Sequence, residues 1–249
     1  MNRRDFVAIL GASVMTRVDG TTAPETQAIK AVAFDAFVIF DLRAIAEVLS
    51  QLYPQKSAEI LTLWRTRQFE YTWLRTLTNT YVDFWQVTEE SLRFACRSAG
   101  IVPKSAELDR LMEVYLRLPV WPDVHATLRK LKESGIRLAF LSNFTRKMLD
   151  DNVRHAGLES YFEEYLTTDN VRAFKPDTRS YQMGTRHFAV SVDEIVFAAF
   201  AAWDVAGAKR FGYPVYWCNR LGQLPEELGA TADRTAADLS ELPNFAGLK

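Results

Sequence analysis

Polar side chains that could do chemistry follow the segments of this chain that are expected to form buried strands. In an open parallel sheet the carboxyl ends of the strands meet at one edge, and ligands bind there. A single carboxylate ends the apolar run AVAF, and a lysine in the loop sequence FKPD supplies a cation. We therefore predict one crevice at this edge. The polar residues expected there are Asp35, Ser142, Asn143, Lys175 and Asp204.

Asp35 and Lys175 are the pair with the clearest chemical use. A neighbouring ammonium keeps a partly desolvated carboxylate ionised, so that it can act as a nucleophile. Pro176, after the lysine, is expected to be the first residue of a helix. Ser142 and Asn143 offer hydroxyl and amide donors suited to a substrate carboxylate. The alternatives are a structural ion pair or helix cap for Asp35 and Lys175, and ordinary turn formers for Ser142 and Asn143.

Continuous apolar runs indicate the strands that must position these residues, because strands covered on both faces show no alternation. Helical patterns that end at Gly135, Gly157 and Gly212 separate the later runs. Strands that alternate with helices predict an α/β fold with a Rossmann-like, mainly parallel sheet and right-handed crossovers. The runs lie at residues 31–34, 136–142, 195–200 and 214–219.

A long helical stretch interrupts this alternation after the first strand. It contains the segments RAIAEVLSQLY, SAEILTLWRTRQFEYTWLRTLT, TEESLRFACRSAG and SAELDRLMEVYLRL, and Thr88 is expected to open the third helix. A stretch of this length should pack on itself as a small helical bundle beside the sheet. The predicted organisation is a leader and linker at 1–27, an α/β core at 28–43 and 119–249, and an inserted helical cap at 44–118.

The first residues have the layout of a bacterial twin-arginine export signal. In MNRRDFVAILGASVMTRVDG, the arginines Arg3 and Arg4 precede a short apolar run at 6–15. This run cannot span a bilayer, which takes ~20 residues. Cleavage after 18–20 would leave a periplasmic protein that begins near Thr21. The alternative is an ordinary N-terminal segment with two incidental arginines, in a cytoplasmic protein.

Charge and cysteine content argue against several classes of protein. The chain of 249 residues has 30 basic and 31 acidic residues, so no basic footprint for nucleic acid is present, and a small molecule is the favoured partner. Cys96 and Cys218 lie far apart and form no CxxC pair, which predicts buried core thiols. A single disulfide in an oxidising compartment is the alternative.

The motifs around these residues resemble the haloacid dehalogenase superfamily, in particular the type II 2-haloacid dehalogenases that act on the (S) enantiomer. The resemblance covers about residues 30–229, and its helical motif LWRTRQFEYTWLRTLTNTYVDF is specific to that subfamily. It implies an HAD-like core with a helical cap, a hydrolase of carbon–halide bonds that uses no metal or cofactor, and a homodimer. The other matching motifs are AVAFDAF, LRFACR, LSNFTRKMLD, HAGL, FKPDTRSY and AWDVAGAKRFGYPVYWCNR.

The resemblance also implies roles for the catalytic residues. Asp35 would attack the halogen-bearing carbon in line and form an ester, which water then hydrolyses to a hydroxy acid of inverted configuration. Arg65 would meet the departing halide, since a fixed guanidinium stabilises charge that develops there. Lys175 would lie beside the nucleophile, and Asp204 would orient Lys175 or the hydrolytic water.

The remaining matched positions are implied to surround the substrate. Ser142 and Asn143 would hold its carboxylate, and Tyr181 would belong to the polar network around the nucleophile. Aromatic side chains would form the apolar pocket for its carbon chain. The full set of implied substrate-binding residues is Phe37, Phe69, Phe84, Ser142, Asn143, Tyr181 and Trp203.

Two departures from the family leave two functions open. The sequence DAFVIFD is one residue shorter than the usual Asp-x-Tyr-Gly-Thr-Leu-Phe-Asp, with Val38 in place of the glycine and threonine, and AFAAWD places Ala199 and Ala201 where a serine and an asparagine are usual. One function is hydrolytic dehalogenation of short (S)-2-haloalkanoic acids to (R)-2-hydroxy acids. The other is binding of a small carboxylate without efficient turnover. Phosphatase activity is disfavoured, because Phe37 occupies the position of the second aspartate that supports magnesium chemistry in phosphatases of the superfamily.

Overall fold

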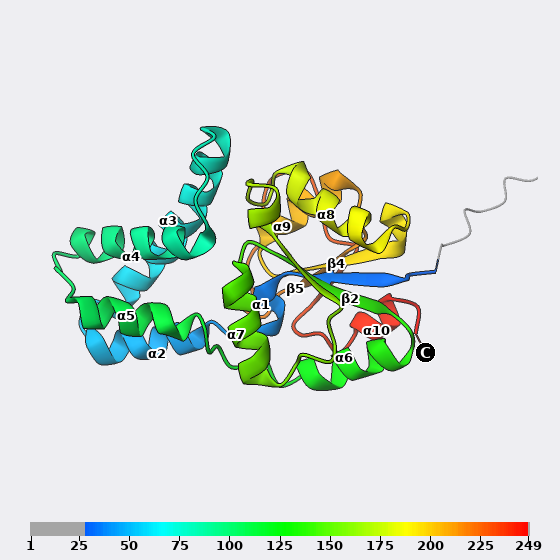
Figure 1. Ribbon diagram of the computed structural model, residues 1–249, viewed down its shortest axis with the longest axis horizontal. Helices are drawn as coiled ribbons and strands as arrows, with labels where there is room; N and C mark the ends of the chain where they lie inside the picture. The colour runs from blue at the N-terminus through cyan, green and yellow to red at the C-terminus, as the bar shows by residue number, and fades with distance from the viewer. Residues whose placement is uncertain (1–27, 249) are drawn as a thin grey trace, which may run out of the picture.

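The computed structural model describes residues 28–248, and the predicted export signal lies outside the described residues. Its centre is a parallel sheet with the strand order β3-β2-β1-β4-β5-β6, seen edge-on in Figure 1. The α/β class and the parallel sheet predicted from the sequence are therefore confirmed. The strands are β1 Ala31–Phe34, β2 Arg137–Ser142, β3 Glu164–Thr167, β4 Ile195–Ala199, β5 Val215–Cys218 and β6 Arg234–Ala236.

Helices cover both faces of the sheet, which explains why the strands are apolar without alternation. In β1, Val32 and Phe34 pack into one apolar cluster and Ala31 and Ala33 into the other. Helices α6, α7 and α10 contribute to the first cluster, and α8 and α9 to the second (Figure 1). Their bounds are α6 Val124–Glu133, α7 Arg146–Ala156, α8 Thr178–Phe188, α9 Ala202–Phe211 and α10 Leu242–Phe245, with short 3-10 turns at Thr168–Asn170 and Val192–Glu194.

The stretch between β1 and β2 forms the helical insertion expected from the sequence. A short helix, α1 Ala36–Ile39, follows β1, and four longer helices then pack beside the sheet (Figure 1). The C-terminal end of α3 projects away from the rest of the molecule in this view. The helices of the insertion are α2 Arg43–Leu52, α3 Ser57–Leu77, α4 Phe84–Ser98 and α5 Ser105–Val114.

Three details of the elements differ from the sequence predictions. Strands β3 and β6 were not expected, because they are short edge strands with partly exposed patterns. Helix α4 begins at Phe84, since the Asp83 side chain caps it, and Thr88 lies buried inside the helix rather than at its start. Helix α8 is likewise capped by Asp177, so Pro176 precedes the helix instead of opening it.

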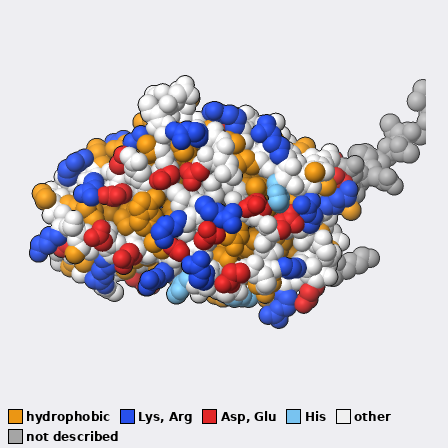
Figure 2. Space-filling view, viewed as in Figure 1, with side chains coloured by type: hydrophobic (Ala, Val, Ile, Leu, Met, Phe, Trp, Pro, Cys, Tyr) orange, Lys and Arg blue, Asp and Glu red, His pale blue; other side chains and the backbone are white. Residues whose placement is uncertain are grey.

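The surface and the cysteines agree with the sequence analysis. Both Cys96 and Cys218 are buried and free, which confirms core thiols and argues against the disulfide alternative. Figure 2 shows basic and acidic side chains interspersed over one face of the molecule. No helix within residues 28–248 combines the length and the apolar character needed to cross a membrane.

Candidate active site

Asp35 lies at the carboxyl end of β1, where its carboxylate is held by two groups. Oδ2 accepts a hydrogen bond from the backbone N–H of Phe37 at 2.9 Å, and Oδ1 accepts one from Lys175 Nζ at 2.7 Å. The residue is nearly buried. Asp35 is thus both the cap of α1 and the partner of a lysine, and neither role turns the carboxylate away from the crevice.

Lys175 is the centre of the polar network. Its ammonium is completely buried and binds a second carboxylate, Asp204 Oδ2, at 2.6 Å. Burial alone would lower the pKa of Lys175, but the adjacent carboxylates of Asp204 and Asp35 outweigh it and raise that pKa above its ordinary value. The lysine therefore stays charged, and one ammonium serves two carboxylates.

Asp204 lies in the first turn of α9 and is as buried as the lysine. The Tyr181 hydroxyl donates to its Oδ1 at 2.6 Å. Burial raises the pKa of Asp204 above its ordinary value, because Lys175 offsets the loss of solvent only in part. Helix α9 can approach Tyr181 this closely because residue 207 is glycine, where a Cβ would collide with the tyrosine hydroxyl and with Pro176.

Tyr181 joins the polar network around Asp35 that the resemblance implies, through its hydrogen bond to Asp204. It is fully buried behind Asp204 and is absent from the residues that line the crevice. Burial and the charge of Asp204 raise the pKa of Tyr181 well above its ordinary value, so its hydroxyl remains a donor. The hydrogen bond to Asp204 makes Tyr181 a positioning residue in this structure, and its direct contact with a substrate stays a prediction.

Ser142 and Asn143 end β2 beside this network and line the crevice. Asn143 Oδ1 accepts the backbone N–H of Lys175 at 3.1 Å, so its amide N–H groups are the part that can donate to a substrate carboxylate. Ser142 Oγ accepts the backbone N–H of Phe144 at 3.1 Å, and its proton can donate in the same way. Each residue thus accepts one hydrogen bond from the backbone and has an N–H or O–H group that can donate to a substrate carboxylate.

The shortened segment after Asp35 is a regular turn of helix rather than a strained loop. Val38 lies inside α1 with its side chain fully buried, and it is absent from the residues with positive φ. The missing glycine is therefore not needed here. The backbone N–H of Phe37 supplies a hydrogen bond to the nucleophile in a segment that lacks the usual threonine hydroxyl.

Two distant side chains hold the carbonyl groups of this turn. Trp121 Nε1 donates to the carbonyl oxygen of Phe37 at 3.3 Å, and Arg220 donates to that of Val38. Arg220 also forms a nearly buried two-pronged ion pair with Asp123. The sequence analysis did not identify these residues, and the only available signal was the arginine that follows β5 in the matching motif WCNR.

Arg65 projects from α3 of the insertion toward the aromatic residues of the crevice. Its guanidinium carbon lies 4.7 Å from the ring centre of Phe37 and 4.9 Å from that of Phe69. Nη1 donates to Gln68 Oε1 at 2.5 Å, and the buried Gln68 in turn donates to Thr88 Oγ1 at 2.6 Å. The guanidinium is thus fixed by packing and by a hydrogen-bond chain, which makes it a preorganised anion acceptor.

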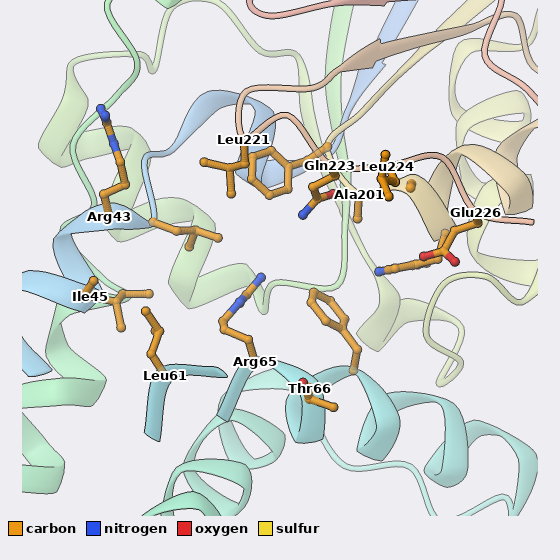
Figure 3. Close-up of a pocket in the computed structure, with 16 residues that line it drawn as sticks. Arg43, Ile45, Leu61, Arg65, Thr66, Ala201, Leu221, Gln223, Leu224 and Glu226 are labelled. Atoms are coloured by element: carbon orange, nitrogen blue, oxygen red, sulfur yellow. The ribbon is translucent and has the colours of Figure 1, made fainter. Parts of the chain in front are cut away.

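All of the predicted site residues except Lys175 and Tyr181 line one or both of two neighbouring cavities. The inner cavity has a volume of about 10 Å³ and lies at the nucleophile, whereas the outer cavity has a volume of about 450 Å³ and contains Arg65 (Figure 3). Phe69, Ala201 and Trp203 line both. The inner cavity is lined by Asp35, Phe37, Phe69, Phe84, Ser142, Asn143, Phe144, Ala201, Trp203 and Asp204.

Ala199 and Ala201, at and just after the end of β4, contribute no polar side chain to the network, as the sequence indicated. Ala199 is buried at the end of β4, and Ala201 precedes α9 without any side-chain cap. Neither side chain can donate a hydrogen bond to Asp35 or to an ester formed on it. Among residues 28–248, no three His, Cys, Asp or Glu side chains form a group that could hold a metal ion. The arrangement is suited to nucleophilic attack by a carboxylate on a small anionic substrate.

Comparisons with known proteins point to one family. The family model described as haloacid dehalogenase-like hydrolase matches residues 9–212. An (S)-2-haloacid dehalogenase of Pseudomonas sp. (strain YL) is 41% identical over 82% of this chain and 89% of its own. A solved L-2-haloacid dehalogenase covers 89% of this chain and 100% of its own, with 34% identity and a TM-score of 0.86.

A further solved structure is that of a relative with an acid covalently bound to it. The L-2-haloacid dehalogenase of Xanthobacter autotrophicus with chloropropionic acid covalently bound is 31% identical to this chain, with a TM-score of 0.82. The match covers 88% of this chain and 98% of that one. The two folds therefore agree over most of this chain and nearly all of the relative.

Proposed function

The chain belongs to the haloacid dehalogenase-like hydrolase family, and from this premise we propose that it hydrolyses the carbon–halogen bond of (S)-2-haloalkanoic acids to give (R)-2-hydroxy acids. The observation that carries the proposal is the buried Lys175 ammonium, which binds both Asp35 and Asp204 at the end of the central strands. It places a cation against the carboxylate of Asp35 beside a small cavity lined by aromatic rings.

The first step is an in-line displacement. A carboxylate oxygen of Asp35 forms a bond to C2 of the substrate as the bond between C2 and the halogen breaks, with inversion at C2. The halide takes the electron pair and leaves toward Arg65. Since Gln68 fixes this guanidinium, it needs no rearrangement as the negative charge develops.

The second step is hydrolysis of the aspartyl ester. The inner cavity, of about 10 Å³, has room for about one water molecule between Asp35 and Asp204. Asp204 accepts a proton as this water attacks the aspartyl carbonyl carbon, and Lys175 stabilises the oxyanion. The bond between that carbon and the ester oxygen then breaks, the departing oxygen takes the proton held by Asp204, and the hydroxy acid leaves with its inverted configuration.

The relative with covalently bound chloropropionic acid supports the ester route for this fold. Two other activities are less well supported. Phosphatase chemistry would need a metal-binding carboxylate where Phe37 stands. Binding without turnover is favoured only by the donors missing at Ala199 and Ala201, while the nucleophile, the lysine and the fixed Arg65 are all assembled.

The test is halide release from (S)- and (R)-2-chloropropionate, measured separately with the purified protein. Release from the (S) acid alone, with (R)-lactate as the product, is expected, and Asp35→Asn should abolish it. A single turnover in H₂¹⁸O should place the label on Asp35 rather than in the lactate, because the enzyme supplies the first oxygen. No release from either acid by a folded protein would refute the proposal and favour binding without turnover.

We propose in addition that the protein forms a homodimer and is exported by the twin-arginine pathway. Leu74 and Leu77 support a dimer, since these side chains are 54% and 79% exposed at the projecting end of α3. Arg3 and Arg4 support export. Light scattering coupled to size exclusion tests the first proposal. A reporter fused to residues 1–27, with and without Arg3→Lys and Arg4→Lys, tests the second.

A further inference from the structure

The outer cavity is much larger than a departing halide requires. Its volume of about 450 Å³ lies in the range of cavities that bind whole small molecules, roughly 300 to 1,000 Å³. Figure 3 shows Arg65 extending from α3 into the space between the insertion and the segment 221–226. The halide acceptor therefore occupies only part of the cavity.

The nucleophile and the halide acceptor lie in different cavities. Asp35 lines the inner cavity and Arg65 the outer one. In an in-line displacement the reacting carbon must lie between these two groups, which places it at the boundary formed by Phe69, Ala201 and Trp203. Ser142 and Asn143 lie on the inner side of this boundary, so a substrate bound for reaction turns its carboxylate toward them and has open space on its outer side.

Apolar side chains dominate the outer side. Leu61 and Ile45 line its wall on the insertion, and Leu221 and Leu224 line the opposite wall (Figure 3). These last two side chains are 52% and 85% exposed and form the apolar rim of the cavity. Together they form an apolar surface that is continuous with the site of reaction and is not used by a substrate as small as chloropropionate.

Because residue 201 is alanine, the boundary between the two cavities is more open than it would be with a larger side chain at this position. Ala201 contributes only a methyl group to both cavities, at a position where the resemblance implies an asparagine. A longer substituent on C2 can therefore extend past this residue into the outer cavity.

We propose that the outer cavity binds the alkyl substituent of the substrate, so that the protein prefers 2-haloacids with an apolar chain of about four or more carbons on C2. This inference rests on the proposed function and specifies its substrate class. Each methylene that moves from water into the cavity should raise kcat/KM by roughly threefold to fourfold.

The experiment measures halide release from 2-bromopropionate, 2-bromohexanoate and 2-bromooctanoate. We expect kcat/KM to rise along this series. Ala46→Phe fills the outer cavity from α2 and should lower the ratio of kcat/KM for the longest acid over the shortest at least tenfold. Ala58→Phe, an exposed position on α3 outside the cavity, is the matched control and should leave the ratio within twofold. Leu224→Ser, at the exposed rim, should lower the ratio without disturbing the fold.

The outcomes separate this inference from the proposed function. Turnover of 2-bromopropionate without a rise along the series, or equal ratios in Ala46→Phe and Ala58→Phe, would overturn the inference and leave the function intact. If no acid is turned over, the proposed dehalogenase function is refuted. Calorimetric measurement of hydroxy-acid binding then tests whether the outer cavity binds an alkyl chain. Tighter binding of 2-hydroxyoctanoate than of lactate, weakened by Ala46→Phe, would then support the inference, and equal affinities would refute it.

Discussion

The guanidinium of Arg220 donates two hydrogen bonds to the carbonyl oxygen of Val38, from Nε at 3.1 Å and from Nη2 at 2.9 Å. Val38 is the third residue after Asp35 in sequence, whereas Arg220 follows β5, which lies two strands away from β1 in the sheet. The same guanidinium is anchored by Asp123. An ion pair nearly hidden from solvent thus fixes the short turn that orients Asp35.

We expect Arg220→Ala to weaken both the fold and catalysis. Removing one member of a buried pair leaves Asp123 uncompensated and should cost ~3 to 5 kcal/mol in the free energy of unfolding. The loosened turn should lower kcat more than it changes KM. Arg234→Ala is the control, because its ion pair with Glu241 is about half exposed and should cost ~0 to 1 kcal/mol. Urea titration and halide release measure the two effects, and equal stability losses would contradict the assignment.

The same pair predicts a pH dependence of stability. Burial would raise the pKa of Asp123, but the Arg220 guanidinium and the backbone N–H of Leu239 lower it below its ordinary value. A carboxyl group with a depressed folded-state pKa contributes stability above its unfolded pKa of ~3.9, and this contribution is lost as the pH falls through the folded value. The stability difference between wild type and Arg220→Ala should therefore shrink below about pH 4. A difference that stays constant from pH 7 to pH 3 would count against this linkage.

Tyr181→Phe should slow the reaction while the protein remains folded. The variant removes the hydrogen bond to Asp204, a contact to a charged group that is worth ~1.5 to 3 kcal/mol, and kcat should fall roughly tenfold to a hundredfold. Tyr213→Phe is the matched control, since its buried hydroxyl donates to the backbone of Tyr181 and does not touch Asp204. If both variants lose the same activity, the role of Tyr181 is only structural.

Lys175→Met should abolish halide release and destabilise the protein, because Asp35 and Asp204 would lose their shared cation. Adding Asp204→Asn should recover part of the stability but none of the activity.

The raised pKa of Lys175 also determines how the stability of the wild type changes at high pH. Its contribution to stability is complete below the unfolded pKa of ~10.4 and is lost only as the pH rises through the higher folded value. Loss of activity between pH 8 and 10 without unfolding would contradict this assignment.

Ala201→Asn should increase the rate if the missing donor limits the reaction. One preorganised donor at such a site is worth ~10²- to 10³-fold in kcat, and the structure leaves position 201 without any side-chain hydrogen bond. Ala201→Leu provides similar bulk without a donor and should give no gain. An equal effect of the two substitutions on kcat would show that size alone matters at this position.

Local patterns in the sequence were sufficient to predict much of this protein. Continuous apolar runs indicated buried parallel strands, glycines marked the ends of α7 and α9, and the long helical interruption between β1 and β2 appears as predicted. The ends of these strands also identified Asp35, Ser142, Asn143 and Asp204, because strand polarity fixes the edge of the sheet at which a ligand binds. The short strands β3 and β6 were not predicted, because a few partly exposed residues give little hydrophobic pattern.

The hydrogen bonds that hold the site residues in place were visible only in the tertiary structure. It placed Tyr181 behind Asp204, joined Gln68 of α3 to Thr88 of α4, and brought Arg220 to Val38 across 182 positions of sequence. It also separated the nucleophile and the halide acceptor into two cavities that share Ala201. Hydrogen-bond partners and cavity walls come from segments far apart in the chain, and a single sequence carries no periodic signal for such contacts. The residue types therefore determined which chemistry is possible, and the packing of distant elements decided which groups perform it and how much space the substrate has.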